Sequence, residues 1–172
     1  MGEAKSVNEM KSDLFLPEEV DRFSNPIEAR KKAMDYLARR EYGRLELNKK
    51  LSHFGFAPDV AASAVDQLHD DGLQDDRRFA ESFLQSRISQ GKGPVRTRLD
   101  LRERGLDDVL IEEVLGDSAA NWVELATAVR LKKFGTAEPR DFKEKARQMR
   151  FLQYRGFEQE HIQAALATHG DD

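Results

Sequence analysis

The amino-acid sequence predicts an all-α protein whose three tandem three-helix repeats stack into an elongated, curved array. The first observation is composition: the 172 residues are rich in Leu, Ala, Glu, Lys and Arg and only 8% aromatic, which favours helix over sheet. The second is a helix–glycine–helix pattern that recurs around Gly55, Gly105 and Gly156, 50 and 51 residues apart. The third is the local net charge, which changes sign at each of these glycines.

The three stretches around these glycines align position by position. A leucine stands four residues before each glycine, and Phe or Leu follows it directly. The apolar residues six and ten positions after the glycines are Ala61, Val65, Ile111, Leu115, Ile162 and Leu166. Positions four apart share one face of a helix, so these residues are predicted to be buried. Glycine suits the left-handed conformation that ends a helix, and the apolar residue behind it can fold back on the last turn.

An amphipathic segment precedes each glycine hairpin, at about residues 27–40, 75–89 and 120–134. Each repeat is therefore predicted to run helix, loop, helix, glycine turn, helix. A single unit of this size buries little core, so we expect each repeat to stack against its neighbours. The predicted bounds are a flexible acidic N-terminal arm at 1–25 and repeats at 26–73, 74–117 and 118–170.

Composition and spacing disfavour several classes of function. The chain has no cysteine, which excludes disulfides and thiolate metal sites and is compatible with a cytoplasmic location. No apolar run approaches the roughly 18 residues that a membrane span needs. The four histidines, His53, His69, His161 and His169, stand alone without ligand spacing, so no metal site and no cofactor are predicted.

Two motifs suggest chemistry without meeting its requirements. The stretch HDDGLQDDRRF (69–79) has the acidity of a metal loop, but its glycine is misplaced for a calcium loop, and helix capping by Asp75 or Asp76 explains it better. The stretch GKGPVRTR (91–98) lacks the spacing of a phosphate loop, which leaves a backbone nest or a basic backbone contact open. Pro94 within it can open the next helix. No serine occupies a nucleophile elbow, so the protein is not predicted to be an enzyme.

Basic residues gather before each glycine and acidic residues after it. The segments 28–55, 87–105 and 129–156 carry +4, +4 and +6, from eight, six and nine basic residues against four, two and three acidic ones. The segments that follow them carry −5, −6 and −4. The candidate partner- or nucleic-acid-binding residues on the basic faces are Arg39, Arg40, Arg44, Arg87, Lys92, Arg96, Arg98, Arg102, Lys132, Lys133, Arg147 and Arg150, with Lys143 and Lys145 close by.

Two interpretations of these basic faces remain open. A solvated surface, with its cations paired to the acidic third helices, would explain each residue singly. Three clusters in register favour an extended anionic partner instead, either a nucleic-acid backbone or a protein polymer wrapped around one. Aromatic residues are sparse near the clusters, so stacking on single-stranded bases is not strongly indicated.

The stretch GLQDDRRFAESFLQSRISQGKGPVRTRLDLRERGL (72–106) resembles the centre of the RecX family of regulatory proteins. That family shows Gly-Leu-x-Asp-Asp-x-x-Phe-Ala, then Arg, then Gly-x-Gly-Pro and a basic helix that ends in Gly-Ile or Gly-Leu. Residues 33–51 and RFLQYRGF (150–157) are similar to its first and third units, and the resemblance spans about 27–168. Met34 and Asp35 are variations on the pattern. Gly43 replaces an expected serine cap, which weakens that cap by roughly a few tenths of a kcal/mol.

The resemblance implies an all-α regulator that binds the RecA nucleoprotein filament in its helical groove and inhibits RecA. Filament extension, ATP hydrolysis, strand exchange and co-protease activity would fall as a result. We also expect a monomer without membrane association that binds single- and double-stranded DNA weakly and without sequence specificity. The alternative is a stand-alone helical DNA-binding regulator, which the acidic net charge of −4 and the lack of a distinct recognition helix disfavour. A purely structural scaffold would leave the register of the basic clusters unexplained.

Overall fold

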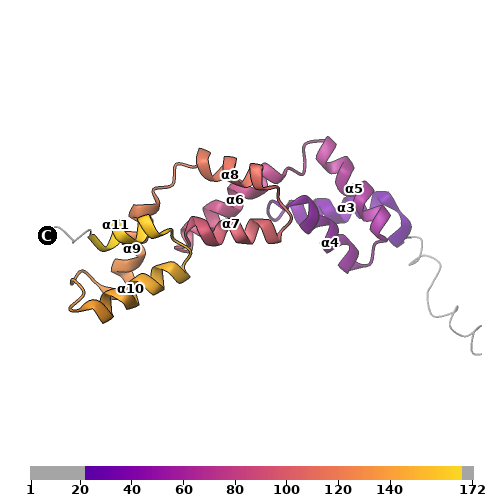
Figure 1. Cartoon of the computed structure of the whole chain (residues 1–172). Coiled ribbons are helices and arrows are strands. Elements are labelled where there is room, and N and C mark those ends of the chain that lie inside the picture. Colours follow the sequence, from indigo (N-terminus) through magenta and orange to yellow (C-terminus); the bar gives the residue numbers. More distant parts are fainter. Residues whose placement is uncertain (1–21, 168–172) are drawn as a thin grey trace, which may run out of the picture. The chain divides into compact units, whose positions relative to one another are not determined.

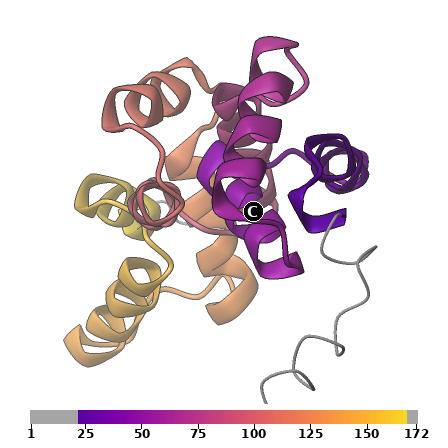
Figure 2. The same ribbon diagram turned by 90° about the vertical axis from the view of Figure 1, so that its right-hand side faces the viewer.

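The computed structural model describes residues 22–167, so most of the predicted N-terminal arm, and His169, lie outside the described range. Within that range the chain consists of α-helices joined by loops and contains no strand, which confirms the all-α prediction (Figure 1 and Figure 2). No described helix is long and apolar enough to cross a membrane. The chain divides into two compact units, Met1–Asp75 and Asp76–Asp172, which are described separately below.

The first unit contains α3 (Pro26–Leu37), α4 (Arg44–Phe54) and α5 (Pro58–Asp70). Asn25 caps α3 by accepting the backbone N–H of Ile27 at 2.9 Å, and Pro26 occupies the first turn, where no N–H is needed. Gly43 stands at the N-cap of α4 and forms no side-chain cap bond. The three helices enclose a core of ten residues, namely Ala29, Ala33, Tyr42, Leu47, Leu51, Phe56, Ala61, Ala64, Val65 and Leu68.

The second unit contains two further sets of three helices. The first set comprises α6 (Asp76–Ser89), α7 (Pro94–Glu103) and α8 (Asp108–Asp117), and the second comprises α9 (Trp122–Phe134), α10 (Phe142–Tyr154) and α11 (Gln159–Ala167). Each set has its own cluster of buried apolar side chains, and Trp122 packs against both clusters. The predicted order of helix, loop, helix, glycine turn, helix therefore holds in all three repeats.

The glycine turns that the sequence singled out are built alike. Gly55, Gly105 and Gly156 have φ values of 128°, 81° and 91°, in the positive region that residues other than glycine rarely adopt. In each turn the N–H of the residue after the glycine donates, at 3.2 Å, to the carbonyl oxygen of the leucine four residues before the glycine. This is the 6→1 bond of a Schellman motif, and it closes the end of each second helix. All three leucines are fully buried.

The two repeats of the second unit are joined by backbone at the start of α7. The N–H groups of Gly93 and Val95 donate to the carbonyl oxygens of Arg155 and Gly156, both at 2.9 Å. A Cβ on Gly93 would lie 2.4 Å from the Gly156 oxygen, so the close approach requires glycine. Two N–H groups of the stretch that the sequence left open as a backbone nest, those of Gly93 and Val95, are therefore occupied by the glycine turn of the third repeat.

Candidate interaction surface

Most of the candidate cations in the first two repeats pair with carboxylates. In the first unit Arg40 bonds to Glu46 at 3.0 Å and Arg44 to Asp66 at 2.5 Å. In the second repeat the pairs are Arg87–Asp100, Arg96–Asp100, Arg98–Glu112 and Arg102–Asp108, at 3.3, 3.2, 2.5 and 2.6 Å. Arg39 is exposed and Lys92 half-buried, and neither forms an ion pair with another described residue. The solvated, salt-bridged interpretation thus describes most of the first two clusters.

Asp100 on α7 lies between two candidate arginines. Its side chain is 6% exposed, and it contacts Arg87 of α6 as well as Arg96 one turn back on its own helix. Arg87 also lies over the ring of Phe83, 4.5 Å from its centroid, with Arg104 at 4.6 Å from the same ring. Since Arg87 is only 18% exposed, it stabilises the packing of α6 on α7 and is poorly placed to meet a partner.

Arg98 has a second structural role. It bonds to Glu112 on α8 and also lies 3.8 Å from Glu158, just before α11, so it links the second repeat to the third. The hydrogen bond to Glu112 raises the pKa of Arg98, against the opposing effect of burial, and the arginine stays charged. The sequence placed this side chain on a binding face, yet it is 23% exposed and holds two repeats together.

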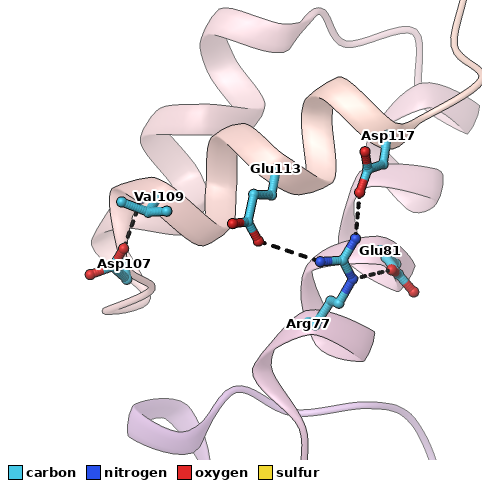
Figure 3. Close-up of polar contacts among 6 residues, drawn as sticks. All are labelled: Arg77, Glu81, Asp107, Val109, Glu113 and Asp117. Atoms are coloured by element: carbon cyan, nitrogen blue, oxygen red, sulfur yellow. Dashed lines mark hydrogen bonds and ion pairs between the residues drawn. The ribbon is translucent and has the colours of Figure 1, made fainter.

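Arg77 on α6 was not among the candidate residues, although it makes three ion pairs (Figure 3). Its guanidinium contacts Glu81 on its own helix at 3.1 Å, and Glu113 and Asp117 on α8 at 3.5 and 2.6 Å. The hydrogen bond to Asp117 is the main reason that the pKa of Arg77 is raised. In the sequence only the spacing to Glu81 signalled this network, because α8 is brought near by the fold.

The cations of the third repeat differ from those of the first two. Lys132, Lys133, Lys143, Lys145, Arg147 and Arg150 are exposed, and none forms an ion pair within residues 22–167. The nearby acids are already engaged at the start of α10. Asp141 caps the helix by accepting the N–H of Glu144 at 2.8 Å, and Glu144 accepts the N–H of Arg140 at 2.8 Å. Uncompensated positive charge is therefore concentrated on α9 and α10.

Two aromatic rings join α9 to α10 beneath these cations. The rings of Phe134 and Phe151 lie 5.3 Å apart and nearly perpendicular. Arg147 lies over Phe134 at 5.7 Å, while Lys133 and Arg155 lie over Phe151 at 5.9 and 5.4 Å. Such cation–π contacts hold the side chains in place without neutralising their charge.

Two hollows accompany this surface. A cleft of about 420 Å³ between α6 and α9 has an apolar floor that includes Ile88, Val129 and Phe151, and it is bordered by Lys132, Lys133 and Arg155. A shallower hollow of about 360 Å³ lies along α10 and is lined by Arg140, Asp141, Lys143, Glu144, Arg147 and Arg150. Both hollows are lined mainly by the third repeat, and most of their charged lining residues are basic.

One group of side chains has the composition of a metal site. Ligand atoms of Glu158, Glu160 and His161 lie within 4.8 Å of one another. His161 Nδ1, however, accepts the backbone N–H of Glu158 at 3.3 Å, which fixes the ring at the start of α11. The local hydrogen bond explains the position of this histidine without an ion.

The sequence matches three successive family models. They are described as the first, second and third three-helix domains of RecX and match residues 29–68, 75–115 and 121–166. A regulatory protein RecX of Halorhodospira halophila is 44% identical over 140 residues, covering 81% of this chain and 87% of the relative. A regulatory protein RecX of Pseudomonas syringae pv. tomato is 42% identical over 147 residues, covering 86% and 95%.

Solved structures show the same fold. The crystal structure of RecX from Lactobacillus salivarius aligns with a TM-score of 0.68 at 21% identity, covering 86% of this chain and 96% of that one. A second structure, of a regulatory protein RecX, aligns with a TM-score of 0.69 at 19% identity, covering 95% and 79%.

Proposed function

The chain belongs to the RecX family of regulatory proteins, and from this premise we propose that it binds the RecA nucleoprotein filament and inhibits RecA. The observation that carries the proposal is the match of all three repeats, in order, to the three RecX domains. Bound to the filament, the protein would block its extension and lower ATP hydrolysis, strand exchange and co-protease activity.

The proposed action is binding without catalysis. Three repeats of similar build can touch several positions along a polymer at once, and linked contacts raise the overall affinity beyond that of any one repeat. Surface cations would contact DNA phosphate, and other faces would contact RecA. A monomer in the cytoplasm is sufficient for this mode of action. The contact with DNA alone would be weak and indifferent to base sequence, because it is mainly electrostatic.

A titration of RecA ATPase activity on single-stranded DNA tests the proposal. Adding the protein to preformed filaments should lower the steady-state rate of ATP hydrolysis toward the DNA-free background. An excess of single-stranded DNA serves as the control, since inhibition by sequestering DNA would be relieved and inhibition through the filament would persist. An unchanged rate at saturating protein, together with tight binding to a particular duplex sequence, would favour the stand-alone DNA-binding regulator.

A further inference from the structure

We propose that one face of α10 is a binding site for single-stranded nucleic acid. The α10 ridge, as we call this face, consists of Lys143, Arg147, Arg150 and Tyr154. Its three cations would contact successive phosphates, and the ring of Tyr154 would stack on an unpaired base. The proposal deepens the DNA contact of the proposed function and rests on it, while naming a site and a strand type.

Helical geometry places the four side chains together. They occupy positions i, i+4, i+7 and i+11 of one continuous helix, so at 3.6 residues per turn they fall within an arc of about 60°. With a rise of about 1.5 Å per residue, the ridge extends roughly 16 Å along the helix axis. All four side chains are exposed. A single strand laid along the helix could therefore meet them in turn.

The charge of the ridge is available to a ligand. No carboxylate of residues 22–167 pairs with Lys143, Arg147 or Arg150, whereas Arg40, Arg44 and Arg102 each have one at 3.0 Å or less. The hollow beside the ridge is also lined by Arg140, Asp141 and Glu144, of which Arg140 and Glu144 pair with each other at 3.6 Å. Unpaired cations release condensed counterions from a phosphate backbone, and this release is what drives non-specific binding.

Tyr154 indicates which anionic polymer fits the ridge. Its side chain is 86% exposed at the end of α10, in line with the three cations. An acidic protein surface could match the cations but would gain little from the ring. Bases of a single strand offer π-faces to such a ring, whereas a duplex keeps them stacked inside. The sequence did not strongly indicate base stacking, because aromatic residues are sparse near the basic clusters and nothing in it showed that Tyr154 is exposed.

Two variants of the full-length protein test the site, with a control matched in charge. The ridge variant is K143A/R147A/R150A, and the control is R30A/K31A/R77A, which removes three basic side chains that have carboxylate partners and are not candidate binding residues. Both lose three positive charges, so a general effect of net charge would appear in both. Y154S removes the ring and Y154F keeps it.

Binding is measured by fluorescence anisotropy without RecA. The ligands are an oligo(dT) of about 30 nucleotides and a duplex of about 30 base pairs. The salt concentration is varied from about 50 to about 200 mM. We expect the ridge variant to reduce the slope of log K against log salt on oligo(dT) by about 2, at roughly 0.7 per lost phosphate contact, and the control to leave it near the wild-type slope. Y154S should weaken oligo(dT) binding by about tenfold and leave duplex binding unchanged, while Y154F binds like the wild type.

Three results would overturn the proposal. The first is a ridge variant with the wild-type salt slope. The second is an equal loss of oligo(dT) binding in the ridge variant and the control, which would show that the loss comes from net charge alone. The third is a Y154S variant that binds oligo(dT) as tightly as the wild type, which would show that the ring does not stack on a base. Since the binding assay contains no RecA, its result does not depend on the outcome of the ATPase test of the proposed function.

Discussion

Gly156 lies at a position where two structural features require the absence of a side chain. Its positive φ ends α10, and its carbonyl oxygen accepts the N–H of Val95 at the start of α7. A Cβ at this position would lie 2.4 Å from the Cβ of Arg96 and 2.7 Å from its backbone nitrogen. The residue is thus constrained twice, by its own conformation and by the neighbouring repeat. The sequence predicted the first constraint from the repeated pattern, but the second depends on contacts between residues about sixty positions apart.

Replacing Gly156 by alanine should therefore lower the free energy of unfolding more than the same change at Gly135. Gly135 also has a positive φ, of 78°, but a Cβ there would meet nothing within 4 Å. We expect G135A to lower the free energy of unfolding by about 1–3 kcal/mol, from backbone strain alone. G156A should add roughly another 1–3 kcal/mol from the clash with Arg96. Urea denaturation of both variants measures the difference, and equal losses would contradict the docking of α7 on the Gly156 turn.

Asp100 offers a second prediction at this scale. Alanine at Asp100 leaves Arg87, which is 18% exposed, without its carboxylate, and an uncompensated buried charge is costly. We expect D100A to destabilise the second unit by about 3 kcal/mol. The matched control is D108A, whose partner Arg102 is about half exposed, and we expect it to cost less than about 1 kcal/mol. Thermal unfolding followed by circular dichroism compares the two; similar losses would mean that the Asp100 pairs are no stronger than surface pairs.

At the scale of helices, the three glycine turns and the apolar residues around them followed from the sequence, because both arise from local spacing. The pairing of charges did not. Arg98 and Arg102 are both basic positions of α7, yet Arg98 joins α8 to the start of α11 and Arg102 reaches only Asp108. Which carboxylate lies opposite a given arginine depends on how the helices are packed. Arg98, which the sequence analysis placed on a basic face, therefore contributes to the packing of the helices.

The R98A variant should separate packing from surface charge. Losing its bonds to Glu112 and Glu158 should lower the free energy of unfolding by about 1–2 kcal/mol, and R102A should lower it by less than about 1 kcal/mol. Because the pKa of Arg98 is raised by folding, its contribution is fully present below the pKa of an unfolded arginine and disappears only at strongly alkaline pH. The difference between R98A and wild type should thus be constant from about pH 6 to about pH 9. A difference that changes steadily over this range would contradict the assignment.

For the whole molecule, the sequence predicted the helical repeats and the family, and the comparisons confirm both. The repeat bounds at 73/74 and 117/118 remain predictions, as do the binding residues. Alternating charge indicated that basic faces exist, but it could not show which cations are paired. Most candidate cations of the first two repeats pair with carboxylates, whereas the exposed candidates of α9 and α10 form no ion pair within residues 22–167. This distinction requires distances between side chains, and of the candidates in all three repeats it favours those of the third as phosphate contacts.

The central claim is that the protein recognises the RecA filament through contacts beyond phosphate. The chain has no cysteine, so a single one introduced near the N-terminus can carry a fluorophore. The labelled protein is titrated with oligo(dT) alone and with RecA filaments on the same oligo(dT), at about 50 and about 200 mM salt. We predict tighter binding to the filament at both salt concentrations, with a smaller loss on raising the salt than for DNA alone, because protein contacts add to the phosphate contacts. Equal affinity for filament and naked DNA, with the same salt dependence, would contradict the claim.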